Sequence, residues 1–276
     1  MICAWEAYLN LLPPRMRTFV NKQGSDTLIE MRLRLGRPPQ LITRYGSCWM
    51  QQCVTRDDLN FCLNVACRYS AWSTESPRQG YITANGGHRI GLCGRVATDK
   101  GKIVAVQSLS SLCIRVARDF PGLSAQIKGT GSMLIIGRPG SGKTTILRDL
   151  IRRQNNVCVI DEREEIFPLW KDQFVFPTGD TTDVLSGCSK RDGLEIALRC
   201  MGPDTIAIDE ITSQEDCLAL LHAGWCGVKL IATAHAGSKE DLFTRPVYCP
   251  IINAALFDTL VVLNSDKSWK EERLKI

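Results

Sequence analysis

The sequence has few aromatic residues, no long apolar run and no recognisable leader, and each shortage excludes a class of protein. The longest apolar stretches, such as MLIIG and LVVL, are far shorter than the roughly 18 residues that indicate a membrane-spanning helix. The first residues, MICAWEAYLN, lack a basic segment followed by an apolar one, so we expect no export signal. Aromatic residues make up 7% of the chain, too few for an extensive base-stacking surface. We therefore expect a cytosolic protein.

Cysteine is abundant, but its spacing lacks the usual pattern of a metal site. The chain has 13 cysteines and no CxxC pair. The closest pairs, Cys48/Cys53 and Cys62/Cys67, each have four residues between them. A zinc site that uses Cys62 and Cys67 is one alternative. Reduced cysteines that serve as small core residues are the preferred interpretation, and they agree with a cytosolic setting.

Charge is divided unevenly along the chain. Residues 1–118 contain 16 Lys and Arg against 7 Asp and Glu, a net charge of +9, whereas residues 119–276 contain 18 against 22, a net charge of −4. The basic first part favours an acidic partner, an anionic membrane surface or a nucleic acid. The alternative is a solvated arginine-rich face, from which some arginines reach the nucleotide of a neighbouring subunit.

Hydrophobic patterning changes near residue 125 and predicts two domains. Residues 55–73 have apolar side chains at helical spacing, and residues 80–107 read as successive strands with turns at 85–87 and 99–101. From residue 131, continuous apolar strands alternate with helices, which is typical of a mostly parallel sheet covered on both faces. We predict an α/β protein with a smaller α+β domain at 1–125 and a P-loop domain at 126–276. One early strand should bury an alternating set: Ile29, Met31, Leu33 and Leu35.

The strongest chemical motif is the glycine-rich segment GRPGSGKT, which matches G-x-x-x-x-G-K-[ST] without deviation. It follows an apolar strand and opens a helix, as a phosphate-binding loop requires. Its glycines let backbone N–H groups wrap phosphate oxygens. We expect Lys143 to contact the β- and γ-phosphates and Thr144 to hold Mg²⁺. The expected nucleotide-binding residues are Gly137, Arg138, Pro139, Gly140, Ser141, Gly142, Lys143, Thr144 and Thr145.

Two later strands end in residues suited to phosphate chemistry. TIAIDE ends in Asp209, which we expect to hold Mg²⁺, and Glu210, which we expect to orient or deprotonate the attacking water. KLIATAH ends in His235, which can donate a hydrogen bond to the transferred phosphoryl group. A structural histidine is the alternative for His235. His222 and the capping-box segment Ser213–Asp216 are interpreted as structural.

A third strand, VCVID, ends in an acidic cluster of Asp161, Glu162, Glu164 and Glu165. Because the carboxyl ends of parallel strands face one crevice, we expect this cluster to handle Mg²⁺ or water, with Glu162 and Glu165 as catalytic candidates. A solvated acidic loop is the alternative.

The blocks GRPGSGKTT, VIDEREEI, IAIDEI and ATAHA resemble the Walker A, Asp box, Walker B and His box of secretion-superfamily ATPases, which include type II and type IV secretion and pilus motors. The segments GYITANGGHRIGLCGRV, SSLCIRVAR and TDVLSGCSK resemble more closely the stage III sporulation protein AA family of spore-forming Firmicutes. The resemblance extends from EMRLRLGRPP to LVVLN. It implies a RecA-like P-loop ATPase core that uses ATP and Mg²⁺.

The resemblance also implies a place of action. The protein would be a cytoplasmic ATPase of the mother cell, held peripherally at the membrane by a membrane protein of the export channel to the forespore. It would act as a homo-oligomer, a hexameric ring, in which N-terminal arginines serve the neighbour's nucleotide. The matching positions are Arg89, Arg95 and Arg115. The chain departs from the family pattern at Thr181 and at residues 257–259, where arginines are usual.

Two other functions stay open as alternatives. The first is a nucleic-acid-dependent ATPase that uses the basic N-terminal domain, although no RNP-like segment occurs and we expect no appended single-strand-binding domain after the core. We therefore do not expect nucleic acid as a partner. The second is a scaffold that binds ATP without hydrolysing it.

Overall fold

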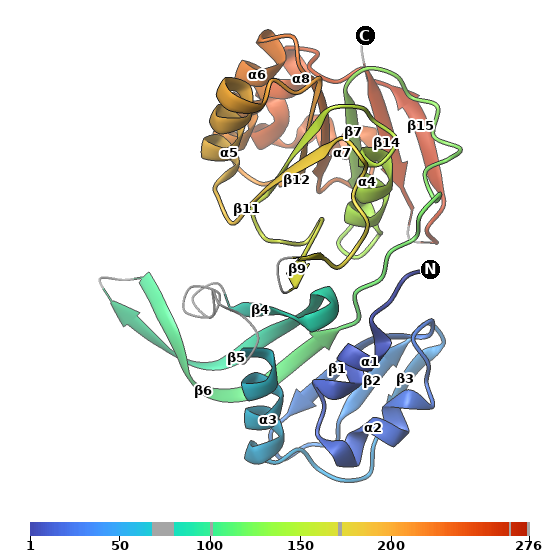
Figure 1. Cartoon of the computed structure of the whole chain (residues 1–276), viewed down its shortest axis with the longest axis vertical. Coiled ribbons are helices and arrows are strands. Elements are labelled where there is room, and N and C mark those ends of the chain that lie inside the picture. Colours follow the sequence, from blue (N-terminus) through green and yellow to red (C-terminus); the bar gives the residue numbers. More distant parts are fainter. Residues whose placement is uncertain (68–79, 100–101, 171–172, 265, 275–276) are drawn as a thin grey trace. The chain divides into compact units, whose positions relative to one another are not determined.

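The computed structural model describes residues 1–67, 80–99, 102–170, 173–264 and 266–274 (Figure 1). The chain forms two compact units, the first made of Met1–Asp119 with Pro168–Val175 and the second of Phe120–Phe167 with Phe176–Ile276. The domain boundary near residue 125 stays a prediction, and residue 125 itself lies in the second unit. Among the described helices, none is long and apolar enough to span a membrane.

The first unit is built on an antiparallel six-stranded sheet. The strands lie in the order β3 (Gly46–Trp49), β2 (Gln40–Thr43), β1 (Leu28–Arg34), β6 (Lys102–Arg115), β5 (His88–Asp99) and β4 (Tyr81–Ala84). The unit also contains α1 (Trp5–Asn10), α2 (Pro14–Asn21) and α3 (Arg56–Cys67). Tyr8, Met16 and Leu59 from these helices share one buried cluster with Met31 and Ile114 from the sheet.

Most local predictions for this unit are confirmed where the structure describes them. The predicted helix at 55–73 is α3 over Arg56–Cys67, and the rest of the prediction lies outside the described residues. The predicted turn at 85–87 is a short 3₁₀ turn, η2 (Asn85–Gly87), between β4 and β5. Residues 100 and 101 of the second predicted turn lie outside the described residues. Cys62 is buried in the core cluster and Cys67 packs against it, as expected of small core residues.

The predicted burial of β1 is wrong at its two ends. Met31 and Leu33 are buried, but Ile29 is 43% exposed and Leu35 is 38% exposed. The pairing with β2 is irregular at the start of β1, where a bulge shifts the alternation of side chains. Leu28 therefore occupies the inner face in place of Ile29.

The second unit is built on a seven-stranded sheet in which only the last strand is antiparallel. The strands lie in the order β11 (Thr182–Ser186), β8 (Val157–Asp161), β12 (Thr205–Ile211), β13 (Lys229–Ala234), β7 (Met133–Gly137), β14 (Thr259–Leu263) and β15 (Trp269–Arg273). All five strands predicted for this part of the chain are present. The mostly parallel α/β architecture is confirmed.

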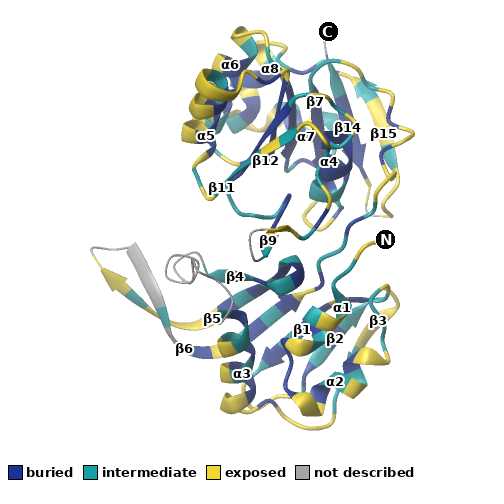
Figure 2. Ribbon diagram, viewed as in Figure 1, coloured by how far each residue is buried: buried dark blue, intermediate teal, exposed yellow. Residues whose placement is uncertain are grey.

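Helices cover both faces of this sheet. α4 (Lys143–Ile151) packs against β7, β12 and β13. On the other face, α5 (Lys190–Ile196), α6 (Gln214–Trp225) and α8 (Cys249–Asn253) share a buried cluster with alternate strand residues. The remaining elements of the unit are η3 (Ala197–Met201), α7 (Lys239–Thr244) and η4 (Pro246–Tyr248). Figure 2 shows the central strands as a continuous buried layer, which explains why their sequences are almost entirely apolar.

Local sequence signals fix where these helices begin. Ser213 accepts a hydrogen bond from the Asp216 amide, and Asp216 accepts one from the Ser213 amide, so the predicted capping box starts α6. Ser189 caps α5 and Ser238 caps α7 in a similar way. Strands β11 and β15 were not predicted, because TDVLS and WKEER are polar segments at the edges of the sheet.

His88 is a fully buried structural histidine of the first unit. Its Nδ1 accepts the Ala117 N–H at 3.0 Å, and its Nε2 lies 3.0 Å from the Ala4 carbonyl oxygen. Nε2 therefore carries the proton and donates it to Ala4, which defines a neutral ring. Burial lowers the pKa of His88 to about 4, and the Arg118 charge adds to this effect against the opposing Ala4 hydrogen bond.

We expect His88 to make the stability of the protein depend on pH. The unfolded chain binds a proton at this ring below about pH 6.5, whereas the folded chain binds it only below about pH 4. The free energy of unfolding should therefore fall as the pH drops from 6.5 towards 4, by on the order of 3 kcal/mol. Urea titrations at pH 7 and pH 4.5 should show a smaller decrease in the free energy of unfolding for His88→Gln than for the wild type. The exposed His222→Gln is the control, and equal falls in wild type and His88→Gln would contradict the assignment.

Candidate functional site

A glycine-rich loop joins β7 to α4 at the carboxyl edge of the parallel sheet. Gly140 and Gly142 have φ values of +74° and +104°, which only glycine adopts without strain, and nothing lies within 4 Å of where their side chains would be. Gly137 is tightly packed instead, because a side chain there would lie 2.4 Å from Ser141 Oγ. The loop therefore has free space beside Gly140 and Gly142, while the Ser141 N–H is bound to the Arg138 oxygen.

Lys143 at the start of α4 is buried and uses every proton of its ammonium group. Its Nζ lies 3.1 Å from the Gly137 oxygen, 3.3 Å from the Arg138 oxygen and 3.1 Å from His235 Nδ1. Burial lowers the pKa of Lys143, while the charges of Asp209 and Glu210 oppose that shift. The cation is therefore held at the inner end of the loop by fixed acceptors.

Asp209 joins the glycine-rich loop to the neighbouring strand. Thr144 Oγ1 donates to one carboxylate oxygen of Asp209 at 2.6 Å, and the buried Thr233 hydroxyl donates to the other. A threonine hydroxyl and a carboxylate are the hard oxygen ligands that Mg²⁺ prefers. Thr144 and Asp209, the predicted pair, could therefore hold this ion.

Glu210 lies next to Asp209 on a distorted part of β12. The pairing of β12 with β13 is irregular between Ile208 and Ile211, and Glu210 has a φ of +57°, which is unusual for a residue with a side chain. Its amide donates to Thr233 Oγ1 at 2.8 Å. Burial raises the pKa of the Glu210 carboxyl, but contacts with His235 and Arg163 outweigh it and hold the pKa below its ordinary value.

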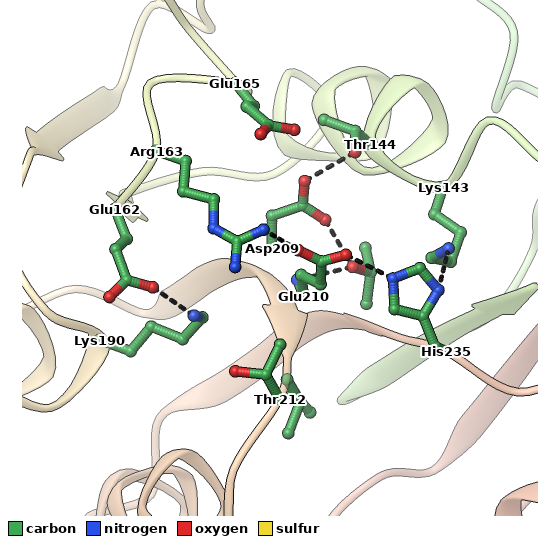
Figure 3. A network of polar contacts seen from close by, with 12 residues as sticks. Lys143, Thr144, Glu162, Arg163, Glu165, Lys190, Asp209, Glu210, Thr212 and His235 are labelled. Atoms are coloured by element: carbon green, nitrogen blue, oxygen red, sulfur yellow. Dashed lines mark hydrogen bonds and ion pairs between the residues drawn. The ribbon is translucent and has the colours of Figure 1, made fainter. Parts of the chain in front are cut away.

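His235 connects Glu210 to Lys143 (Figure 3). Because the Lys143 ammonium can only donate, His235 Nδ1 must accept, so Nε2 carries the proton and donates to Glu210 Oε1. The His235 backbone N–H is fixed in turn by the Tyr248 hydroxyl at 3.2 Å. The imidazole is therefore held in one tautomer, with its N–H directed at the carboxylate.

Asp161, the first residue of the acidic cluster, caps a loop from its buried position. Its carboxylate accepts the backbone N–H groups of Glu165, Ile166 and Phe167 at 2.9, 3.0 and 2.8 Å. Burial raises the pKa of Asp161 to about 7, although the Phe167 and Ile166 hydrogen bonds oppose the shift. Its role is to shape the loop at 161–167.

The two carboxylates proposed as catalytic candidates in this cluster lie differently. Glu162 pairs with the buried Lys190 Nζ at 2.5 Å, which directs it away from Thr144 and Asp209. Figure 3 shows the Glu165 carboxylate directed towards the side of the site on which Thr144 lies. The geometry therefore favours Glu165 over Glu162 for a part in the chemistry.

The three predicted trans-acting arginines all lie in the first unit. Arg89 on β5 and Arg115 on β6 are paired neighbours in the sheet. The Arg89 guanidinium lies 4.0 Å from the centre of the Tyr81 ring, and Arg115 Nε lies 3.3 Å from Glu30. Arg95 is exposed farther along β5. Their service to a neighbour's nucleotide stays a prediction.

A buried hydroxyl without a hydrogen-bond partner indicates that this loop fits a phosphate group. Ser141 Oγ is buried inside the loop and has no hydrogen-bond partner in the described part of the chain. The free space beside Gly140 and Gly142 leaves room for a phosphate group, the Ser141 hydroxyl can donate to one of its oxygens, and the Lys143 charge lies nearby. The residues present therefore fit a nucleoside polyphosphate.

Sequence reasoning missed Arg163 and Thr233. Arg163 NH1 forms an ion pair with Glu210 Oε2, although its sequence context, DEREEI, reads simply as an acidic loop. Thr233, the next-to-last residue of β13, binds Asp209 and Glu210. A polar residue two positions before His235 in an otherwise apolar buried strand was the available signal for Thr233.

The chain is similar to proteins of a known family. The family model described as "Sporulation stage III, protein AA" matches residues 5–273. Stage III sporulation protein AA of Bacillus subtilis (strain 168) is 34% identical over 254 residues, which cover 86% of this chain and 83% of that protein.

Two solved structures share the fold. The ATPase DotB of Legionella pneumophila has a TM-score of 0.56 at 15% identity and covers 94% of this chain and 79% of its own. The pilus retraction motor PilT with bound ADP has a TM-score of 0.56 at 16% identity and covers 88% of this chain and 76% of its own. The chain thus shares the RecA-like fold of these two proteins.

We expect Asp161→Ala to release the loop at 161–167, because three backbone N–H groups lose a buried acceptor. The cost should be about 2 kcal/mol or more in the free energy of unfolding. Hydrogen exchange at the amides of residues 165–167 should accelerate, while Asp180→Ala, an exposed control, should leave it unchanged. Unaltered exchange in Asp161→Ala would contradict the capping role.

Proposed function

The chain belongs to the sporulation stage III protein AA family, and from this membership we propose that it hydrolyses Mg-ATP to drive or assemble a membrane-associated export channel between mother cell and forespore. The observation that carries the proposal is the meeting of Lys143, Asp209 and His235 at one sheet edge. Lys143 and His235 are hydrogen-bonded to each other, Thr144 binds Asp209, and His235 binds Glu210. The shared fold of PilT, a pilus retraction motor solved with bound ADP, supports a nucleotide as the ligand.

Each residue has a defined task in this proposal. The loop at 137–145 holds the phosphates through backbone N–H groups, and Lys143 balances their charge. Bound Mg²⁺, held by Thr144 and Asp209, would supply charge neutralisation at the phosphates. Glu210 takes the proton from the attacking water and orients it, while the His235 N–H holds Glu210 in place. Glu165 supports the metal side of the site.

The proposed assembly is a homo-oligomeric ring, a hexamer, in which Arg89, Arg95 or Arg115 reaches the nucleotide of the next subunit. The positively charged first part of the chain supports this arrangement, because a guanidinium stabilises the charge that develops on a transferred phosphoryl group. The ring would be cytoplasmic and would meet the membrane through a membrane protein of the channel.

A nucleic-acid-dependent ATPase is the second candidate function. The first sheet favours it, because Arg89 and Arg115 are opposite each other on adjacent strands and Arg89 lies over the Tyr81 ring. Arg32 lies in another row of the register, opposite Gln40, which in turn is opposite Trp49. Stimulation of hydrolysis by single-stranded DNA or RNA, steeply reduced by added salt, would support this candidate over the export motor.

We expect Lys143→Ala to bind ATP at least about tenfold more weakly than wild type, because the phosphates lose a fixed charge partner. Titration with a fluorescent ATP analogue measures this directly. Lys190→Ala serves as the lysine control, since Lys190 pairs with Glu162 rather than with the loop. Retained affinity in Lys143→Ala would refute the phosphate site.

Specific ATPase activity should rise with protein concentration, because each site would be completed by an arginine of the next subunit. Arg89→Ala should lower the plateau by on the order of a hundredfold or more, the scale of an arginine supplied in trans. Arg56→Ala, an exposed arginine at the start of α3, is the control. Substantial activity that is independent of concentration and of Arg89 would favour a self-contained site.

A further inference from the structure

Arg163 is a basic residue inside the acidic cluster, and its side chain reaches the carboxylate of Glu210. Its NH1 group binds Glu210 Oε2, while the other oxygen, Oε1, receives the His235 N–H. Figure 3 shows Arg163 and His235 approaching Glu210 from opposite sides. The two donors together define one orientation of the carboxylate.

Glu210 needs such restraint because its backbone is unfavourable. A residue with a side chain at φ +57° beside a strand irregularity persists only where surrounding contacts hold it. Thr233 fixes the amide of Glu210. Among the residues that the structure describes, His235 and Arg163 bind its carboxylate.

The loop that carries Arg163 is itself held rigid. Asp161 binds three of its amides, and the buried Arg148 donates to the backbone oxygens of Glu165 and Ile166. Because the loop is fixed, the Arg163 guanidinium also holds the Glu210 carboxylate in a fixed position. The ion pair is 27–40% exposed at its side chains, so it contributes little to the folding free energy.

We propose that Arg163 is a positioning residue for Glu210, keeping its second carboxylate oxygen in place so that the first stays on His235. The inference rests on the proposed role of Glu210 in activating water. Arg163 acts through Glu210 and does not bind the nucleotide. Its loss should therefore affect turnover and leave substrate binding unchanged.

Steady-state kinetics of five variants, one of them the Glu210→Gln background, tests this. Arg163→Gln should lower kcat by about tenfold, because the base becomes misplaced, with KM within about twofold of wild type. Arg163→Lys should recover part of the lost kcat, since lysine restores the positive charge but not the planar guanidinium with its several donors. In a Glu210→Gln background, Arg163→Gln should cause no further loss. Arg199→Gln is the control, because Arg199 forms an exposed ion pair with Glu195.

Three results would overturn the proposal. A raised KM with unchanged kcat would mean that Arg163 contacts the nucleotide. Unchanged or faster turnover in Arg163→Gln would mean that the ion pair is incidental or restrains the enzyme. A further loss of turnover in the Glu210→Gln background would mean that Arg163 acts independently of Glu210.

A second measurement needs no hydrolysis and so separates this inference from the proposed function. The chain has only three histidines, so nitrogen-15 NMR of the imidazole rings can be assigned with His235→Gln. Wild type should show His235 as one tautomer, with the proton on Nε2. In Arg163→Gln, Lys143 should still keep the proton on Nε2, but exchange of that proton should be faster because the Glu210 carboxylate no longer holds it in place. Arg199→Gln should show no such change. An unchanged exchange rate of the His235 proton in Arg163→Gln would refute the positioning role even in an inactive protein.

Discussion

The parallel pairing of β12, β13 and β7 is the constraint on which the whole site depends. The register sets Ala234 of β13 beside Ile136 of β7 on one side and Ile211 of β12 on the other. The ends of the three strands therefore stand at one level, and His235 and the glycine-rich loop follow directly from them. A shift of one residue in any of these strands would turn its side chains to the other face of the sheet.

The distortion in β12 lets the side chains of two consecutive residues point to the same side, which a regular strand does not allow. Neighbouring residues on a strand point to opposite faces, yet Asp209 and Glu210 both serve the same crevice. The irregular pairing and the left-handed backbone of Glu210 turn the second carboxylate towards the first. Thr233 stabilises this turn, because its one hydroxyl accepts from the Glu210 amide and donates to Asp209.

Much of this arrangement could be predicted from the sequence because it follows from local patterns. Apolar strands ending in Asp209 and His235, and the loop that leads to Lys143, are contiguous signals whose meeting follows from parallel topology. Arg163 and the pairing of Glu162 with Lys190 could not be predicted, because the partners are 47 and 28 residues apart and no repeating pattern links them. The bulge in β1 was missed for a related reason, since an alternation of side chains does not reveal an inserted residue.

The assignment of Pro168–Val175 to the first unit has a topological consequence. The chain passes between the units three times, at residues 119–120, 167–168 and 175–176. A protease that cut only after Asp119 would leave a piece of the first unit covalently attached to the second. The first unit is therefore not a detachable N-terminal module. If evolution exchanged residues 1–119 for another domain, most of the first unit would be replaced, but its segment Pro168–Val175 would stay within the sequence of the second unit.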